Sequence, residues 1–386
     1  MLTRSGWGAV AAATVAIALG RLFGVIELYV LAVAILAAVA WAVAATARPL
    51  PKLHVRRSVV PGVVSVGEPA RVDLMVANDS HRRSPVLRLW EPVGAAGAAM
   101  NLSPLRAGER TVAAYRLPTS TRGVVRAGPV RVRRTDVLGL ASRTTTLPGT
   151  TELLVTPRHH PVAFGEGAIG GTLGEHVRVK ALGQTGTEFH TLRPYVVGDD
   201  LRRINWKASA RSNEWIVKET SPEGMRRCTI IFDASGRIDA QEFEQAVSVA
   251  ASLVTGASAA GLVTRFVSTD ADVRGPDVAE TALRWLATVE PASGPLAPPP
   301  GGRFGDGVGL VLLVTSVPAG SAVDAIRSSL SPDDVLVLVC TAPTLGTVGR
   351  FVVDASDEDR FMASWTDLTG RHRSSEPSAR AAGGWR

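Results

Sequence analysis

Two uncharged, apolar runs dominate the first fifty residues of the chain. Residues 5–20 carry no charged side chain, and after a short break residues 28–47 are again uncharged. A helix needs about 20 apolar residues to cross the hydrocarbon core of a bilayer. The second run meets that length, and the first meets it if residues 21–23 complete its last turn. We therefore expect a membrane anchor in residues 1–48, with two transmembrane helices at about residues 7–23 and 25–47.

Charges at the ends of these runs predict the orientation of the anchor. Arg4 precedes the first run, Arg21 lies alone between the two, and the second is followed by Arg48, Lys52, Arg56 and Arg57. Because basic residues accumulate on the cytoplasmic side of a membrane, we expect a two-pass protein of the inner (cell) membrane with its remaining domains in the cytoplasm. The rival interpretation is a signal peptide cleaved after Ala47, but the segment is too long and is interrupted by charges.

Composition narrows the class of protein. With 386 residues, a net charge of +7 and 46% hydrophobic residues, the chain is too long for one small module and too apolar for a disordered protein. Net basicity of this size is weak evidence for nucleic-acid binding. Cys228 and Cys340 lie in separate apolar runs and form no C-x-x-C pair, so neither a disulfide scaffold nor a zinc ribbon is predicted.

Residues 49–157 alternate between apolar and polar side chains over short runs, as at 71–76 and 130–133. This period of two is typical of antiparallel strands with one buried face. Turn-forming Gly, Pro, Asn and Asp residues separate the runs, and no segment has the period of a helix. We expect an immunoglobulin-like β-sandwich in this part of the chain.

Residues 158–185 are rich in glycine and poor in large apolar side chains, which predicts a mobile linker or lid. They contain the pattern G-x-G-x-x-G at 165–170. A dinucleotide site needs a strand before that pattern and a helix opening within it. Because Pro161 interrupts the approach, we prefer the linker interpretation.

From residue 225 onward, apolar runs of strand length alternate with helix-length segments. We expect strands at 228–233, 262–269, 308–315, 335–341 and 351–354, and helices at 239–259, 276–288, 321–330 and 358–368. This alternation is typical of a doubly wound, mostly parallel sheet covered on both faces. The prediction is an α/β domain at 225–369 and a disordered tail at 370–386.

Residues 186–224 form the most charged stretch and read GTEFHTLRPYVVGDDLRRINWKASARSNEWIVKETSPEG. Six acids balance six bases, which favours ion pairing over binding a polyanion. Asp199 is placed to cap a helix that runs to about Arg211, followed by a strand at 215–220. Basic residues would recur on one face of that helix, so either acids of the same protein or an acidic partner or phosphate must balance them.

The same stretch resembles the family known as domain of unknown function 58, through the pattern G-x-x-F-x-x-L-R-x-Y-x-x-G-D-D-x-R-x-I-x-W-x-x-S-A-R. The matching residues are Gly186, Phe189, Leu192, Arg193, Tyr195, Gly198, Asp199, Asp200, Arg202, Ile204, Trp206, Ser209, Ala210 and Arg211. The resemblance implies a membrane-anchored bacterial protein with a von Willebrand factor A-like α/β domain, typically encoded beside a MoxR-type AAA+ ATPase. It implies no reaction, because the family has none assigned.

A von Willebrand factor A-like domain would hold a divalent ion through D-x-S-x-S after its first strand and through a Thr and an Asp of later loops. Asp233 and Ser235 match this set, Arg237 replaces its last serine, and Thr315 is followed by serine rather than aspartate. Hard cations prefer several oxygen ligands with enough negative charge. We therefore expect no cofactor and disfavour magnesium, with Arg237 either standing in for the ion or pointing to solvent.

The expected function is a non-enzymatic adaptor that contacts the lipid bilayer and a protein partner, with the MoxR-type ATPase as the partner that the resemblance suggests. One alternative is a metal-dependent hydrolase or phosphate-handling enzyme that uses Asp199 and Asp200. Another is nucleic-acid binding through the arginine-rich strands near Arg131, Arg133 and Arg134, which we do not favour. The candidate interaction residues are Arg193, Tyr195, Asp199, Asp200, Arg202, Arg203, Asn205, Trp206, Lys207, Ser209, Arg211 and Glu219.

Overall fold

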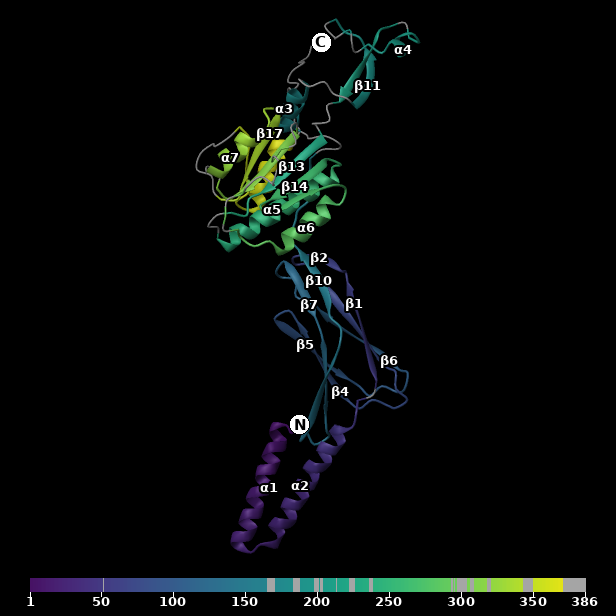
Figure 1. Ribbon diagram of the computed structural model, residues 1–386, viewed down its shortest axis with the longest axis vertical. Helices are drawn as coiled ribbons and strands as arrows, with labels where there is room; N and C mark the ends of the chain where they lie inside the picture. Colours follow the sequence, from purple (N-terminus) through teal and green to yellow (C-terminus); the bar gives the residue numbers. More distant parts are fainter. Residues whose placement is uncertain are drawn as a thin grey trace, which may run out of the picture. The chain divides into compact units, whose positions relative to one another are not determined.

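The computed structural model divides into two compact units, residues 1–156 and residues 157–386, each described by itself (Figure 1). The structure describes residues 1–50, 52–164, 171–182, 188–197, 201, 204–212, 214–221, 226–235, 239–292, 294, 296, 304–305, 309–317, 321–342 and 350–370. The predicted disordered tail lies outside these residues apart from Gly370.

Two long helices, α1 (Arg4–Phe23) and α2 (Ile26–Ala47), form a hairpin at the N-terminus (Figure 1). Gly24 ends the first helix with φ +68°, a left-handed conformation that favours glycine. Both helices are long and apolar enough to cross a membrane, judged by length and composition. The predicted pair of apolar helices is therefore confirmed, with the first starting at Arg4 rather than at residue 7.

Small side chains fill the contact between these two helices. The buried positions are Gly6, Ala13, Ala16 and Gly20 on α1, and Ala32, Val39, Ala42 and Thr46 on α2. Large apolar side chains such as Leu22, Val33 and Trp41 are exposed instead. A helix pair in a soluble protein buries its large apolar residues, whereas transmembrane helices pack through small ones and expose large ones to lipid. The hairpin has the second pattern.

Strands β1 to β10 form two sheets. One has the order β1 (Leu53–Val60), β3 (Arg71–Asn78), β6 (Arg110–Arg116) and is antiparallel. The other has the order β2 (Val63–Ser65), β10 (Thr151–Thr156), β7 (Gly123–Ala127), β4 (Leu87–Val93), β8 (Val130–Thr135), β9 (Ser142–Leu147), with β5 (Ala96–Leu102) paired to β4. Its neighbours are antiparallel except β2 with β10.

Alternate residues of these strands point into a core between the two sheets. In β4, Leu87 and Leu89 are buried while Arg88 and Trp90 face solvent. Leu74 of β3 packs in the same cluster as Leu89, so side chains of both sheets contact one another. Residues 53–156 therefore fold as two packed, largely antiparallel sheets, and the immunoglobulin-like topology stays a prediction.

The second unit contains one six-stranded sheet. Its order is β15 (Ala271–Arg274), β14 (Val263–Ser268), β13 (Arg227–Phe232), β16 (Gly309–Thr315), β17 (Asp334–Cys340), β18 (Val352–Asp354). Neighbouring strands are parallel except β14 with β15. Every residue of β16 is buried, as expected for a strand covered on both faces. The predicted mostly parallel sheet is confirmed. The edge strand β15 is not among the predicted strands, because its four residues are too few for a period to be recognised.

Helices cover both faces of this sheet. The first face packs against α5 (Ala240–Ala259), α6 (Val278–Thr288) and α8 (Glu358–Thr369), in a core that includes Ile230 and Leu312. The second face packs against α7 (Ser321–Ser329), in a core that includes Ile231 and Leu313. Because neighbouring residues of one strand point to opposite faces, both faces are apolar. The carboxyl ends of the parallel strands β13, β14, β16 and β17 consequently meet at one polar edge.

The first part of the predicted linker is packed against this domain instead. Val162 and Phe164 are buried in the core, and Trp365 Nε1 of α8 donates a hydrogen bond of 2.8 Å to Ala163 O. A Cβ added at Gly256 of α5 would lie 2.5 Å from Val162 O, so glycine permits this close approach. We call residues 158–164 the strap.

A helix occupies the last part of the predicted linker. α3 (Gly171–Leu182) buries Leu173 and Val177, one helical turn apart, in the same core. The mobile-linker prediction for 158–185 is therefore wrong for 158–164 and 171–182, because a few well-spaced apolar residues are enough to fix both segments. The G-x-G-x-x-G pattern at 165–170 lies outside the described residues.

Candidate functional site

The loops after β13 and β16 bring three predicted residues together at the polar edge of the sheet. Asp233 Oδ1 accepts hydrogen bonds from Ser235 N at 3.0 Å and from Ser235 Oγ at 2.6 Å. Asp233 Oδ2 accepts from Thr315 Oγ1 at 3.0 Å. Asp233 and Thr315 are buried. The D-x-S segment and the threonine of a distant strand thus form one hydrogen-bond network.

This network is a poor match for a divalent ion. It offers one carboxylate, and both oxygens of that carboxylate already accept hydrogen bonds from neighbouring groups. Divalent cations in proteins take several oxygen ligands. In the part of the chain that the structure describes, no group of three or more His, Cys, Asp or Glu residues is arranged to hold a metal. Arg237 lies outside the described residues, so its role stays a prediction.

Further hydroxyl groups and a cavity lie beside the network. Ser316 Oγ and Thr341 Oγ1 are buried and have no hydrogen-bond partner among the described residues. A cavity of about 560 Å³ opens between the ends of β13 and β14, and Asp270, Trp285 and Glu290 are among its lining residues. Its described lining also includes the hydroxyl-bearing residues Ser268, Thr269 and Thr288.

Asp233→Ala is expected to destabilise this edge. The change leaves the hydroxyls of Ser235 and Thr315 without their acceptor, and such a loss costs about 2–3 kcal/mol of unfolding free energy. Urea unfolding of the full chain in detergent measures the effect, with Asp324→Ala on the exposed surface of α7 as the matched control. Calorimetric titration with magnesium is expected to show no saturable heat. Saturable binding to the native chain that disappears in Asp233→Ala would contradict our interpretation of the site.

The charged stretch folds as a small module of its own. β11 (Glu188–Pro194) and β12 (Ile216–Ser221) pair antiparallel, and the one-turn helix α4 (Trp206–Ser209) lies between them in the chain (Figure 1). Ile204 forms a β-bridge with Val217, which is incompatible with a continuous helix through that position. The predicted helix from Asp199 to Arg211 is therefore wrong, whereas the predicted strand at 215–220 is confirmed as β12.

Several predicted interaction residues hold this module together. Asn205 caps α4, since its Oδ1 accepts from Ala208 N at 3.3 Å. Ser209 Oγ accepts from Ile216 N at 2.8 Å and so ties α4 to β12. The rings of Tyr195 and Trp215 contact each other edge to face, with a distance of 5.7 Å between their centroids. The remaining described residues of the set are Arg193 and Glu219 on the strands and the exposed Trp206, Lys207 and Arg211. Outside the described residues lie Asp199, Asp200, Arg202 and Arg203.

Exposed apolar side chains on the module are the feature that the sequence interpretation missed. Val197 is 94% exposed and Trp206 64%, and Val196, Leu201 and Trp215 are exposed as well. We call these five residues the apolar patch. Its signal in the sequence is the number of large apolar residues in a stretch that otherwise reads as charged. A sheet of only two strands has no core of its own in which these apolar side chains could be buried.

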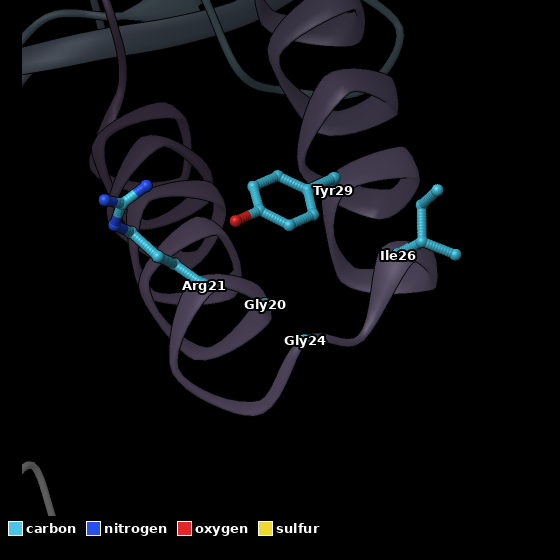
Figure 2. Close-up of a pocket in the computed structure, with 5 residues that line it drawn as sticks. All are labelled: Gly20, Arg21, Gly24, Ile26 and Tyr29. Atoms are coloured by element: carbon cyan, nitrogen blue, oxygen red, sulfur yellow. The ribbon is translucent and has the colours of Figure 1, made fainter.

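A second hollow lies at the turn of the α1–α2 hairpin (Figure 2). It measures about 740 Å³ and is lined by Gly20, Arg21, Gly24, Ile26 and Tyr29. Figure 2 shows the Tyr29 ring between the two helices with its hydroxyl toward α1. A Cβ at Gly20 would lie 3.1 Å from Tyr29 Cε2, so this glycine makes room for the ring. The hollow is a packing feature of the hairpin with one cation, too few groups to define a ligand site.

Comparison with known proteins agrees with the resemblance in the central part of the chain. Residues 191–292 match the family described as "Protein of unknown function DUF58". The uncharacterized protein YeaD of Bacillus subtilis (strain 168) is 28% identical over 146 residues, 36% of this chain and 34% of YeaD. The chain thus matches about a third of the length of that relative. The matched residues include β12 and the strand-end aspartate, so the resemblance is confirmed for this part.

Solved structures give slighter likenesses. The CARDB domain of the PF1109 protein from Pyrococcus furiosus is similar at 17% identity and a TM-score of 0.21, covering 28% of this chain and 97% of that domain. A β-glucosidase from Listeria innocua is similar at 16% identity and a TM-score of 0.17, covering 25% of this chain and 16% of the enzyme. Neither likeness is close enough to bear on function.

Proposed function

We propose that the protein is a non-enzymatic adaptor, tethered in the membrane by the α1–α2 hairpin and binding a protein partner through the module of β11, α4 and β12. The observation that carries the proposal is the apolar patch on that module. Several large apolar side chains exposed on one small module are typical of interaction surfaces. The patch lies within a stretch whose acids and bases balance, which favours a protein over a polyanion as its partner.

The packing of the hairpin supports the tether. Twenty residues of α1 and 22 of α2 reach about 30 Å at 1.5 Å per residue, the thickness of a hydrocarbon core. Small residues lie in the helix contact, and large apolar residues are exposed around it. In water those exposed side chains would be unfavourable. A bilayer removes that cost, so lipid is the solvent that fits the hairpin.

Charge supports a cytoplasmic orientation of the two units. At the open end of the hairpin, Arg4, Arg48, Lys52 and Arg56 are exposed. Arg21 is the basic residue at the closed end, near Glu27 of α2. The positive-inside rule then places the open end, and with it both units, in the cytoplasm.

The second unit is proposed to be von Willebrand factor A-like. Its parallel strands have the order β14, β13, β16, β17, β18, and a D-x-S segment follows β13, the first of these strands in the chain. Ligands of open α/β sheets bind where the carboxyl ends of the strands meet, which is where Asp233 and Thr315 are joined. In our proposal the hydrogen bonds at this edge stabilise the domain without a metal, and the module of β11, α4 and β12 binds the partner.

A MoxR-type AAA+ ATPase is the partner to test first, because the resemblance to the domain of unknown function 58 implies it. Vesicles containing the full chain are mixed with the purified ATPase of the same organism and floated on a density gradient. We expect the ATPase to float with the native chain. Val197→Asp and Trp206→Ala should each weaken that association about tenfold or more, since exposed aromatic and apolar anchors are typical hot spots.

The matched control is Val112→Asp, which makes the same change at a valine that is 62% exposed on β6 of the first unit. It should leave flotation of the ATPase unchanged. If the ATPase floats equally well with all three variants, the patch is not the docking surface. If it never floats with the native chain, the ATPase is not the partner.

A further inference from the structure

The turn between β8 and β9 is built to hold two apolar side chains in solvent. Asp136 Oδ2 accepts from Leu138 N at 2.9 Å, and Asp136 Oδ1 accepts from Ala141 N. Gly139 N donates to Asp136 O at 3.1 Å, and Gly139 has φ +71°. These bonds leave Val137 fully exposed and Leu138 61% exposed. A fixed turn whose tip is apolar is unusual on a surface that meets only water.

This turn is bonded to the start of α1. Thr3 Oγ1 donates to Gly139 O at 2.6 Å and accepts from Gly6 N at 3.0 Å, so one side chain caps the helix and holds the turn. Thr3 N donates to Leu140 O at 2.9 Å. A Cβ at Gly6 would lie 2.1 Å from Leu140 O. Glycine at position 6 therefore allows the turn to press directly on the first turn of the helix.

The same region contacts the end of α2 and is rich in arginine. Arg143 Nη1 donates to Ala47 O at 2.7 Å, which places a cation at the helix C-terminus, where its charge is favourable. Arg133 of β8 is exposed and lies opposite Arg88 of β4 in the register. No acid among the described residues forms an ion pair with Arg88, Arg133 or Arg143. Like charges placed opposite one another are unfavourable unless anions approach them.

From these contacts we infer that the β8–β9 turn is a third membrane contact, in which Val137 and Leu138 enter the interface of an anionic bilayer and the arginines beside them meet its headgroups. The inference rests on the proposed membrane hairpin. Because the turn is bonded to the first residues of α1 and to the last carbonyl of α2, it lies at the level where both helices leave the bilayer. Apolar tips flanked by basic residues bind such interfaces.

This contact would give the arginine-rich strands a role. Arg131 and Arg133 lie on β8, at increasing distance from the turn in the order 133, 131. Arg134 of β8 lies opposite Arg143 of β9. A nucleic acid would use the arginines but leave the apolar tip in water. A bilayer with anionic lipids satisfies both, since it offers phosphates at the surface and hydrocarbon just beneath it. The hairpin and the first unit would then be held at a fixed orientation to the membrane.

Fluorescent labels placed one at a time on the full chain test the inference. Val137→Cys puts a label on the turn, Leu31→Cys puts one at an exposed position near the start of α2, and Val63→Cys puts one on β2 at the other end of the first unit (Figure 1). The native cysteines are buried. Burial raises the pKa of the Cys228 thiol and raises that of Cys340 to about 11, so both react slowly with the label.

The labelled proteins are reconstituted in phosphatidylcholine vesicles that contain nitroxide-bearing lipids, with and without phosphatidylglycerol. We expect quenching at position 137 and at position 31 but not at position 63. Phosphatidylglycerol should strengthen the quenching at 137. Arg133→Gln should remove most of the increase in quenching that phosphatidylglycerol causes. The expected change is about fivefold in the equilibrium between the membrane-bound and the free turn, because one arginine contributes about that factor near an anionic surface.

Each other outcome overturns the inference in a recognisable way. Quenching at 31 without quenching at 137 would keep the membrane hairpin and refute the third contact. An absence of quenching at both positions would refute the proposed hairpin and the contact together. Equal quenching at 63 and 137 would show nonspecific adsorption of the whole unit. A response at 137 to duplex DNA but not to lipid would assign the arginines to nucleic acid.

Discussion

Replacing Glu91 with Gln is expected to unfold the first unit at markedly lower denaturant concentration. Glu91 of β4 is fully buried and pairs with Arg57 of β1, whose side chain is 4% exposed. The pair crosses from one sheet to the other inside the core. Glutamine removes the negative charge and leaves the guanidinium buried without its counter-ion, a change that costs about 3–5 kcal/mol. Hydrogen exchange of the β1 and β4 amides in the full chain measures the effect.

The groups around the pair leave the Arg57 guanidinium little room to move toward solvent when Glu91 is replaced. A Cβ at Gly128 or Gly149 would lie 3.0 Å or 2.9 Å from the terminal nitrogens of Arg57, so the guanidinium is closely held. Both glycines have positive φ, +98° and +110°. Burial, followed by the charge of Glu91, raises the pKa of Tyr115 well above its usual value, which keeps that neighbour neutral. No described group nearby is able to take over the role of the lost carboxylate.

Two controls make this prediction specific. Glu152→Gln breaks the exposed pair of Glu152 with Arg126, which is 2.8 Å long and open to solvent on both sides, and such pairs contribute about 0–1 kcal/mol. The double change Arg57→Met with Glu91→Leu removes both charges and should be less destabilising than Glu91→Gln alone. Equal effects of Glu91→Gln and Glu152→Gln would show that the buried pair is not a stability element.

The sequence of β4 contains a signal for the buried acid of this pair. In β4 the inward positions are 87, 89, 91 and 93, and three of them are Leu or Val while the fourth is Glu91. A carboxylate in the inward register of an otherwise apolar strand requires a buried partner. Arg57 was counted as a flanking charge for membrane orientation, but its side chain is inside the core. The burial pattern of β4 is enough to identify Glu91 as a buried acid. Its partner Arg57 is identified only when the packing of the two sheets against each other is known.

The fold is predicted correctly where apolar residues keep one regular spacing over a whole helix or strand. The apolar hairpin, the alternating strands and the strand–helix series of the second unit have clear periods, and the structure has elements at those places. β15 is not predicted because its four residues are too few to establish a period. Arg265, which is buried on β14, binds Asp272 at 2.8 Å and 2.9 Å. A tertiary contact thus stabilises a strand that propensity alone does not predict.

The candidate site was predicted in part, for a similar reason. Asp233, Ser235 and Thr315 were expected together because strand ends meet at one edge of a parallel sheet, and hydrogen bonds join them. The helix predicted from Asp199 to Arg211 depends on a capping aspartate, a local signal that does not fix how far the helix continues. Ile204 bridges β12 instead, so strand pairing overrode the local preference. The large apolar residues of the apolar patch can be counted in the sequence, but which of them are exposed is seen only in the structure.

Trp365→Ala is expected to release the strap and destabilise the second unit by about 3–5 kcal/mol, the usual cost of removing a buried tryptophan. Trp365 is 1% exposed, and its ring contacts that of Phe164 at a centroid distance of 4.8 Å. Its Nε1 donates to Ala163 O at 2.8 Å. The variant leaves a cavity, frees a strap carbonyl and removes the ring on which Phe164 packs. We expect faster hydrogen exchange and protease cleavage within residues 158–164.

Trp365→Phe and Trp206→Ala separate the contributions to this effect. Phenylalanine keeps much of the ring contact with Phe164 but cannot donate to Ala163 O, so it should cost clearly less than alanine while still loosening the strap. Trp206→Ala removes an exposed tryptophan of the same unit and should leave the strap protected. If the strap exchanges and is cleaved as readily in the native chain as in Trp365→Ala, the segment is a mobile linker after all and its packing contributes nothing to stability.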